Sequence, residues 1–385
     1  MFIDVACSQK KKYNQNAYGD FFASNRFPNM NRVVAVLSDG LGSGIKANIL
    51  ACMTSTMLLK FMENNSDIEK SCEIIMNSLP VCKVRGISYS TFSAIDCYEN
   101  GKTKIVEEGN PDFIWIRNGK VLKPEFQTIQ SKDFKNRKMK VYNIQLEKYD
   151  RIIFCSDGAT QVAMGTKQYP LGLERNGLIK IILNKLEEEP EISSKNFSEY
   201  LVKQIELIAP KRELKDDTSI LSIYCRDPRE SLIFTGPPFH NEKDNYFAKT
   251  FIEFKGKKAI SGGTTANIIS RELNIPITTD ISLGTGKLPG ISKMEGVDFV
   301  CEGMLTLTKT LEYLETGKTE NNAAKTLMEF LLDSDIINFL VGAQMNKAHY
   351  DPNLPIEIEI RKNIIKQMAS VLEEKYLKKV NVQFV

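Results

Sequence analysis

Short apolar runs that end beside an acidic residue recur in the first part of the chain. Residues 33–37 are apolar and mostly β-branched, which is typical of a strand buried on both faces. Asp39 follows this run, and Gly40 begins a glycine-rich turn that lets the backbone bend sharply. Apolar residues then recur at three- and four-residue steps, which predicts a helix over 44–63. The pattern therefore indicates a strand, an acidic glycine turn and a helix.

Three further acids lie beside apolar runs. Asp157 follows the run 151–155, and Asp216 comes shortly before the run 220–225. Asp20 lies in the aromatic segment Tyr-Gly-Asp-Phe-Phe, which is expected to form a hairpin through residues 25–31 with the strand that ends at Asp39. Carboxylates gathered at the ends of buried strands repel one another and lose hydration, so they favour a hard divalent cation such as Mg²⁺ or Mn²⁺.

The remaining pattern up to residue 225 predicts a β-rich unit with pairs of helices. The turn Arg-Asn-Gly-Lys at 117–120 is a good hairpin signal between apolar segments. The other predicted strands are 2–8, 89–98, 104–108, 113–116 and 141–146, and the other predicted helices are 67–79, 178–186 and 197–209.

Beyond residue 225 the pattern changes to strands alternating with helices. A short charged linker, residues 226–230, separates the two parts, so we expect domains at 1–226 and 227–385. Alternating strands and helices indicate an α/β domain with a largely parallel sheet. Its predicted strands are 231–235, 257–261, 297–301 and 380–384, and its predicted helices lie within 241–254, 264–273, 305–314, 323–330 and 358–376.

Composition narrows the class of protein. The 385 residues are 42% hydrophobic and 26% charged, as in ordinary globular proteins, and the formal net charge is only +3. A net charge this close to zero gives no electrostatic reason to expect nucleic acid or an anionic membrane as partner. No segment reaches about 18 consecutive apolar residues, the length that a membrane helix needs. The eight cysteines include no C-x-x-C pair, so a reducing, cytoplasmic location is expected.

Taken together, the acidic motifs resemble those of a known family. Gly-Asp20, Leu-Ser-Asp39-Gly-Leu-Gly-Ser-Gly, Cys-Ser-Asp157-Gly and Lys-Asp216-Asp-Thr-Ser occur in the order found in metal-dependent protein phosphatases, the PPM superfamily. Within that superfamily the first 225 residues look most like the bacterial branch of the sporulation stage II protein E (SpoIIE) phosphatase. The resemblance implies an α+β fold, an α-β-β-α sandwich of two antiparallel sheets with a two-metal centre at one end.

The resemblance also implies a role for each acid. Asp39 would bridge two Mn²⁺ or Mg²⁺ ions, and the Gly40 carbonyl would be a second ligand. Asp20, Asp157 and Asp216 would complete the coordination shells, with Asp39 and Asp157 central to catalysis. The ions would activate a water that hydrolyses a phosphoserine or phosphothreonine ester. Asp217 is interpreted as a solvated carboxylate or one that lies behind the ligands, and not as a primary ligand.

Two features of the family are missing. Eukaryotic members usually carry a histidine shortly after the first Asp-Gly, where this chain has Leu-Gly-Ser at 41–43. The arginine that clamps the substrate phosphate in many relatives has no clear match, which leaves Lys10, Lys11, Lys12 and Arg26 as candidates.

In the C-terminal domain the most specific signal is a strand that delivers Gly262, Gly263, Thr264 and Thr265 to the start of a helix. Backbone N–H groups at such a turn bind anions, so a small anionic ligand is one interpretation. Ordinary strand-to-helix packing is the other, because the chain has no Walker lysine and no complete G-x-G-x-x-G.

These observations favour a cytoplasmic phosphatase that acts on a phosphoprotein, and the family resemblance points to an anti-sigma-factor antagonist in a bacterial partner-switching circuit. Two alternatives remain open. One is a non-catalytic or ligand-gated scaffold whose C-terminal domain senses an anionic small molecule, and the other is a two-metal phosphoesterase for a small phosphate ester.

Overall fold

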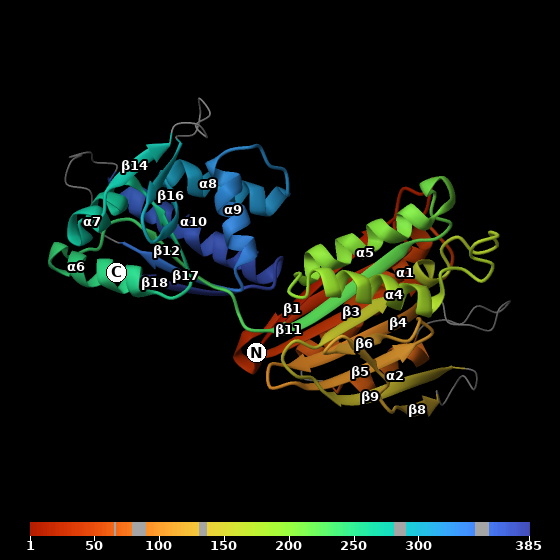
Figure 1. Cartoon of the computed structure of the whole chain (residues 1–385). Helices are drawn as coiled ribbons and strands as arrows, with labels where there is room; N and C mark the ends of the chain where they lie inside the picture. The colour runs from red at the N-terminus through yellow and green to blue at the C-terminus, as the bar shows by residue number, and fades with distance from the viewer. Residues whose placement is uncertain (65–66, 79–89, 131–136, 281–289, 343–353) are drawn as a thin grey trace. The chain divides into compact units, whose positions relative to one another are not determined.

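The computed structural model describes residues 1–64, 67–78, 90–130, 137–280, 290–342 and 354–385. The chain forms two compact units, Met1–Asp227 and Pro228–Val385 (Figure 1), where the sequence predicted a boundary after residue 226. Each unit has its own sheets and its own core, so each is described by itself.

The N-terminal unit contains two sheets in which every strand pairs with its neighbours in antiparallel fashion. The first sheet has the order β1 (Phe2–Lys10), β11 (Thr218–Arg226), β10 (Arg151–Cys155), β6 (Ile114–Arg117) and β7 (Lys120–Leu122). The second has the order β2 (Asp20–Phe27), β3 (Arg32–Gly40), β4 (Ser90–Tyr98), β5 (Lys102–Glu108), β9 (Lys138–Gln145) and β8 (Gln127–Gln130).

Helices cover the outer faces of both sheets. The helices α1 (Ile45–Glu63) and α2 (Ile68–Ser78) pack on the second sheet, and α4 (Glu174–Glu188) and α5 (Ser194–Ile208) pack on the first. A single turn, α3 (Asp157–Thr160), follows β10, and two 3-10 turns, η1 (Pro28–Met30) and η2 (Pro210–Arg212), lie in connections. The predicted α+β sandwich of two antiparallel sheets between helices is confirmed.

Alternation along the strands explains the layers. Val34 and Val36 of β3 pack beneath α1 and α2, whereas Ala35 and Leu37 face the opposite sheet. Phe154 of β10 meets them in the same inter-sheet core. Because side chains alternate with a period of two, strands that are apolar throughout can fill an inner and an outer layer at once.

Most predicted elements of this unit are present, with local differences. The hairpin at Asn118 and Gly119 forms, and both residues have the positive φ values, 50° and 70°, of a tight two-residue turn. β2 continues to Phe27, so its turn to β3 lies at 28–31 and not over the whole of 25–31. β8 and α3 were not predicted, and the end of the predicted helix 67–79 lies outside the described residues.

The strands in the described residues of the C-terminal unit form one seven-stranded sheet. Its order is β14 (Ile277–Asp280), β15 (Ile291–Met294), β16 (Val297–Cys301), β13 (Lys257–Ser261), β12 (Glu230–Thr235), β17 (Ile336–Val341) and β18 (Lys379–Phe384). The last five strands in this order are parallel, and β14 and β15 are antiparallel at one edge. The predicted largely parallel sheet is confirmed, although β14, β15 and β17 were not predicted.

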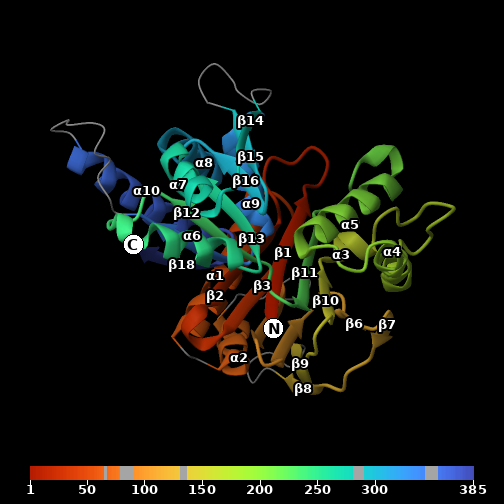
Figure 2. The same cartoon turned by 60° about the vertical axis from the view of Figure 1, so that its left-hand side comes forward.

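Helices lie on both faces of this sheet (Figure 2). The helices α6 (Asp244–Glu253) and α7 (Gly263–Leu273) share one core with the sheet, and α8 (Met304–Thr316), α9 (Ala323–Asp333) and α10 (Leu354–Glu374) share the core on the other face. A 3-10 turn, η3 (Asn241–Lys243), precedes α6. Because the chain starts at central β12, extends to β16 and then returns to β17, the unit is doubly wound.

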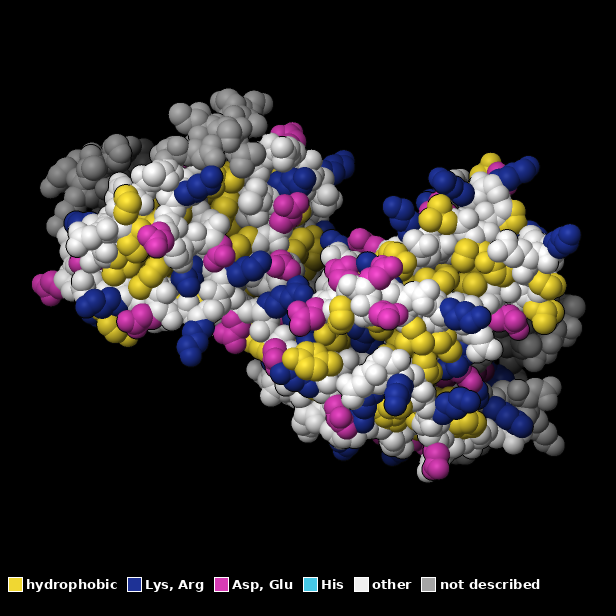
Figure 3. All heavy atoms as spheres, in the orientation of Figure 1, with side chains coloured by type: hydrophobic (Ala, Val, Ile, Leu, Met, Phe, Trp, Pro, Cys, Tyr) yellow, Lys and Arg dark blue, Asp and Glu magenta, His cyan; other side chains and the backbone are white. Residues whose placement is uncertain are grey.

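The surface carries charges of both signs. Figure 3 shows acidic and basic side chains interspersed over the visible face of each unit, and the chain has nearly equal numbers of them, 48 and 51. Within the described ranges, every helix is too short or too polar to cross a lipid bilayer.

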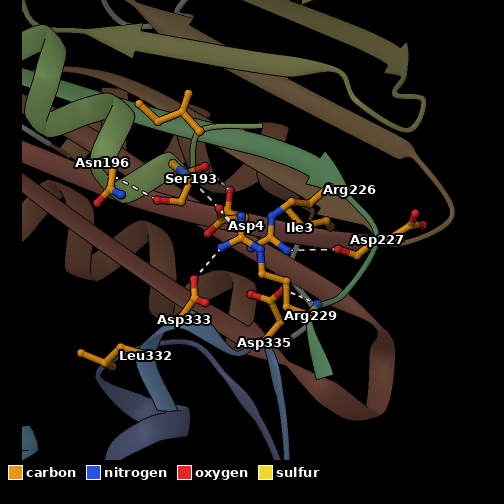
Figure 4. A network of polar contacts seen from close by, with 12 residues as sticks. Ile3, Asp4, Ser193, Asn196, Arg226, Asp227, Arg229, Leu332, Asp333 and Asp335 are labelled. Atoms are coloured by element: carbon orange, nitrogen blue, oxygen red, sulfur yellow. Dashed lines mark hydrogen bonds and ion pairs between the residues drawn. The ribbon is translucent and has the colours of Figure 1, made fainter. Parts of the chain in front are cut away.

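Polar contacts fix the chain where each unit begins and ends (Figure 4). In the N-terminal unit, Asp4 of β1 accepts a hydrogen bond from the Ser194 backbone N–H at 2.9 Å and forms an ion pair with Arg226 at 3.4 Å. In the C-terminal unit, the Arg229 guanidinium binds Asp333 at 2.8 Å, and its backbone N–H donates to Asp335 at 2.7 Å. The latter contacts hold the start of β12 beside the start of β17.

Candidate metal centre

Asp20 and Asp39 lie directly opposite each other on the antiparallel strands β2 and β3. Residues paired in this way project from the same face of a sheet. That face is the inner one, because Leu37, two residues before Asp39, belongs to the inter-sheet core. The β2–β3 register therefore places two carboxyl groups at one end of the sandwich.

Asp157 and Asp216 reach this end from the other sheet. Asp157 begins α3 two residues after the end of β10, and Asp216 lies two residues before β11. Since β10 and β11 pair with Cys155 opposite Ile220, the end of one strand meets the start of the other. The charges of Asp20, Asp157 and Asp216 all raise the pKa of Asp39, so the four predicted acids lie within electrostatic range of one another.

Burial and mutual repulsion change the acidity of these groups. Burial, followed by the charges of Asp20, Asp157 and Asp216, raises the pKa of Asp39 to about 9. Burial also raises the pKa of Asp20 to about 7, although hydrogen bonds from Ser219 and Ser156 oppose the rise. Burial is the first cause of the raised pKa of Asp157 and of Asp216 as well. Without a cation the cluster is electrostatically unfavourable.

The donor set fits a hard divalent cation. The converging side chains offer only oxygen, which Mg²⁺ and Mn²⁺ prefer, and a cation would relieve the repulsion among them. In the described ranges no three His, Cys, Asp or Glu side chains stand at the spacing of ligands to one ion. Each ion would therefore take few carboxylates from the present arrangement, and backbone carbonyl and water oxygens would have to complete its shell.

Asp217 has a structural role. It is 3% exposed, its Oδ1 accepts a hydrogen bond from the Lys12 backbone N–H at 3.1 Å, and its Oδ2 accepts one from Gly19 at 2.9 Å. The carboxylate thus joins the start of β11 to the segment that leads into Asp20. Asp217 therefore lies beside the four acids, but its carboxylate is buried and is not solvated.

The glycines of the Asp-Gly motifs allow close backbone contacts. A Cβ on Gly40 would lie 2.1 Å from the Ala47 carbonyl oxygen in α1, and a Cβ on Gly158 would lie 2.1 Å from the Asp217 carbonyl oxygen. Only glycine permits such approaches. Each motif therefore combines a carboxylate with a position where another segment packs directly on the backbone.

Two serines that were not predicted as site residues position Asp20 through hydrogen bonds. Ser219 Oγ donates to Asp20 Oδ2 at 2.6 Å, and the Ser219 backbone N–H donates to Ser156 Oγ at 3.0 Å. Ser156 and Ser219 are fully buried. Both serines lie close to the predicted acids in the sequence, in the motifs Cys-Ser-Asp and Asp-Thr-Ser. This position could have identified them as site residues.

Among the candidate phosphate clamps, Arg26 is ruled out. It lies six residues beyond Asp20 on β2, is 6% exposed, and pairs with Glu99 at 3.3 Å. Its burial at the far end of the strand keeps it from the acids. Lys12 is better placed, because its charge opposes the rise in the pKa of Asp216.

The four residues predicted to bind an anion belong to the C-terminal unit. Gly262 is the N-cap of α7, and Gly263, Thr264 and Thr265 form its first turn. Thr265 is fully buried.

The sandwich of two antiparallel sheets between helices is the fold that the resemblance to PPM phosphatases implies. A sequence model of the family described as stage II sporulation protein E (SpoIIE) matches residues 29–226, which is more than half of the chain. The chain belongs to the SpoIIE family. The matched segment contains Asp39, Asp157 and Asp216, whereas Asp20 precedes it. No curated protein sequence matches significantly.

Several solved structures are similar to the N-terminal part. The phosphatase domain of the cell-fate determinant SpoIIE from Bacillus subtilis is 18% identical, with a TM-score of 0.44, over 58% of this chain and 92% of that chain. RsbX in complex with magnesium is 19% identical, with a TM-score of 0.41, over 58% and 94%. The RsbU and RsbW domains of a Mycobacterium tuberculosis protein are 16% identical, with a TM-score of 0.45, over 64% and 67%. The family assignment rests on the sequence match.

Proposed function

We propose that the N-terminal unit is a Mn²⁺- or Mg²⁺-dependent phosphatase for phosphoserine or phosphothreonine on a regulatory protein. The observation that supports this most directly is the convergence of Asp20, Asp39, Asp157 and Asp216 at one end of a SpoIIE-type sandwich. Buried acids that raise one another's pKa destabilise the metal-free fold, and two divalent ions would offset that cost.

Asp39 would contact both ions, with the Gly40 carbonyl oxygen as a further ligand. Asp20, together with Asp157 and Asp216 from the other sheet, would also hold the ions. When bound, the ions would supply a nucleophilic water at neutral pH and neutralise charge on the phosphoryl group. The turns at Gly40 and Gly158 keep the backbone positions that orient Asp39 and Asp157.

Other groups of the unit complete the site. The Lys12 backbone N–H donates to Asp217 at 3.1 Å and its charge opposes the raised pKa of Asp216, so we assign the Lys12 ammonium to the substrate phosphate oxygens. Neither histidine of the chain lies in the N-terminal unit, so the leaving oxygen would take its proton from solvent and not from an imidazole.

The proposed substrate is a phosphoprotein in the bacterial cytoplasm, such as an anti-sigma-factor antagonist. Membership of the SpoIIE family supports this choice.

The test is release of phosphate from a phosphoserine peptide by the full chain with Mn²⁺, with and without EDTA, beside Asp39→Asn. We expect activity that EDTA abolishes and that the variant reduces by about a hundredfold or more. Asp227→Asn, at an exposed aspartate of the same unit, is the matched control and should retain activity.

Each other outcome selects a different function. Metal-dependent hydrolysis of p-nitrophenyl phosphate without hydrolysis of phosphopeptides would favour a small phosphate ester as substrate. Folded protein that binds Mn²⁺ but hydrolyses neither substrate would contradict the enzyme assignment and favour a ligand-gated scaffold.

A further inference from the structure

The parallel strands of the C-terminal unit end in a row of glycine turns. Thr235, Ser261 and Cys301 are register partners at the ends of β12, β13 and β16. The chain continues from them with Gly236, with Gly262-Gly263 and with Glu302-Gly303. In open α/β sheets, ligands bind in the crevice beyond the carboxyl ends of the strands.

Two helices begin at this edge without side-chain caps. Gly262 is the N-cap of α7 and Gly303 is the N-cap of α8, and within the described residues neither cap carries a side-chain hydrogen bond. Ala266 is the first amide of α7 to bond within its helix, to the Gly262 carbonyl at 3.0 Å, and Leu307 likewise bonds to Gly303 at 3.1 Å. The three preceding amides of each helix have no partner within it.

The two helix starts adjoin each other. A Cβ built on Gly303 would lie 3.5 Å from the Gly262 Cα, and the Gly262 N–H donates to the Cys301 carbonyl at 2.9 Å. Because α7 and α8 lie on opposite faces of the sheet, their first turns meet only at this edge. Their dipoles therefore place two positive ends beside the same point.

Buried hydroxyl groups near these turns independently indicate a ligand. Thr265 is fully buried, and its Oγ1 has no hydrogen-bond partner in the described part of the chain. The same Oγ1 is 3.5 Å from the position of a Cβ on Gly262, so it faces the turn where α7 begins. Thr235, at the end of neighbouring β12, is also fully buried with its Oγ1 unsatisfied by any described residue. Such groups normally have a partner.

We propose that this edge, between the starts of α7 and α8, binds the phosphoryl group of a small phosphorylated ligand. The first-turn N–H groups of both helices and the Thr265 hydroxyl donate to its oxygens. A phosphoryl group suits them because it accepts hydrogen bonds from several directions and carries the charge that helix N-termini favour.

Charged groups of both signs lie near this edge. The Arg361 guanidinium approaches the edge from α10, with Nη1 2.5 Å from the position of a Cβ on Gly236. Glu302 is exposed, and its backbone carbonyl accepts from Ser261 Oγ at 3.3 Å. A cation therefore lies beside the turn after β12, and an acid lies at the solvent-facing rim.

The experiment is calorimetric titration of the full chain in EDTA, so that a divalent centre in the other unit cannot bind the probe. Inorganic phosphate, pyrophosphate, ADP and adenosine are the probes. We expect pyrophosphate or ADP to bind and adenosine not to bind. Tighter binding of ADP than of pyrophosphate would identify a nucleotide, and the reverse order would identify a simpler phosphate. No binding of any phosphate probe at about 10 mM would overturn the proposal.

Two variants locate the binding. Gly263→Glu places an acid in the first turn of α7, where a Cβ meets nothing within 4 Å and an acid favours the helix. It should weaken probe binding at least about tenfold without lowering the melting temperature. Thr265→Val removes the hydroxyl at nearly constant volume and should weaken binding about threefold or more.

Asn196→Glu is the matched control, because it adds the same charge to the exposed first turn of α5 in the other unit. It should bind the probe as the parent does. Unchanged affinity in both Gly263→Glu and Thr265→Val would overturn the proposal. All three variants should keep the Mn²⁺-dependent hydrolysis of the parent, so failure of this inference is distinguishable from failure of the phosphatase assignment.

Discussion

Asp216 and Asp217 are adjacent residues with different surroundings. Both carboxylate oxygens of Asp217 accept hydrogen bonds from backbone N–H groups, those of Lys12 and Gly19. Among the described residues, the Asp216 carboxylate accepts a hydrogen bond from the backbone N–H of Asp217 at 3.0 Å, and burial raises the pKa of Asp216. One carboxylate therefore stabilises the fold, while the other remains available to a cation.

Asparagine at each position should separate these roles. In Asp217→Asn one carboxylate oxygen becomes an NH2 group, so a buried backbone N–H loses its acceptor and faces another donor. We therefore expect this variant to lower the free energy of unfolding by about 1–3 kcal/mol. Asp216→Asn removes a repelled acid and should leave the metal-free stability unchanged or higher while weakening Mn²⁺ binding about tenfold or more. Urea unfolding in EDTA and calorimetry with Mn²⁺ measure the two effects. Equal losses of stability in the two variants would contradict the distinction.

Glu107 is a buried acid near the end of β5 that is not one of the four predicted metal ligands. It is 2% exposed, and its Oε1 accepts from the Phe113 backbone N–H at 3.1 Å and lies 3.4 Å from Ser93 Oγ. Burial, followed by the charge of Asp112, raises the pKa of Glu107 to about 8, although Lys140 opposes the rise. The folded protein therefore holds this proton at neutral pH, and the unfolded chain releases it.

This proton makes stability depend on pH. Because the folded pKa is the higher one, the contribution of Glu107 is fully present below about pH 4.5 and is lost as pH rises through about 8. Glu107→Gln mimics the protonated acid and should be more stable than the parent at pH 8.5, by about 1 kcal/mol or more, but not at pH 4.5. Urea unfolding at both pH values measures this, and an equal difference at the two would refute it.

At the scale of elements, the contact between β3 and α1 sets the geometry around Asp39. Gly40 lies so close to Ala47 that a Cβ would lie 2.1 Å from its carbonyl oxygen, whereas a Cβ on Gly42 would meet nothing within 4 Å. Gly42 has a φ of +104°, which any other residue adopts only with strain.

Alanine at the two glycines should therefore have unequal effects. Gly40→Ala forces α1 away from β3 and is expected to lower the free energy of unfolding by about 3 kcal/mol or more. Gly42→Ala suffers only backbone strain and is expected to cost about 1–2 kcal/mol. Chemical unfolding in EDTA measures both values. A larger loss for Gly42→Ala would show that the turn, and not the helix contact, limits stability.

The elements also show what the sequence can predict. The strands that end at Asp39 and Asp157 were predicted because a buried strand, an acid and a glycine are local signals. β8 was missed because the polar segment Gln127–Gln130 has no apolar alternation. β17 was missed although Ile336–Val341 is mostly apolar, because a short run that directly follows a helix has no periodicity that identifies a strand.

The site could be predicted only in part. The four acids could be named from their motifs. That Asp20 lies directly opposite Asp39 could not, because the register of β2 and β3 is not determined by those motifs. The same limit applies to Asp217, because whether it or Asp216 meets the Gly19 backbone depends on where β11 begins. Arg26 was a candidate phosphate clamp because of its residue type alone. The structure excludes it because it lies far from Asp20 along β2.

At the scale of the whole molecule, each described core belongs to one unit. Three apolar clusters lie within Met1–Asp227, and the other three lie within Pro228–Val385. Domains with separate cores can unfold in separate transitions. A ligand that binds one folded domain stabilises that domain by mass action.

Calorimetric melting of the full chain should therefore resolve two transitions that respond to different ligands. Mn²⁺ should raise one melting temperature, and Asp39→Asn should abolish that rise. Pyrophosphate in EDTA should raise the other, and Gly263→Glu should abolish that rise. The reason is that the acids belong to the first unit, whereas the two uncapped helix starts belong to the second.

A single transition that both ligands raise would mean that the units unfold cooperatively, since a ligand can stabilise only structure coupled to its own site. Two transitions with the responses exchanged would contradict both assignments. Two transitions with the expected responses would separate the catalytic question from the ligand question, and adding pyrophosphate to the phosphopeptide assay would then test regulation. A change in rate with the parent that Gly263→Glu removes would show that occupancy of the C-terminal edge alters the phosphatase site.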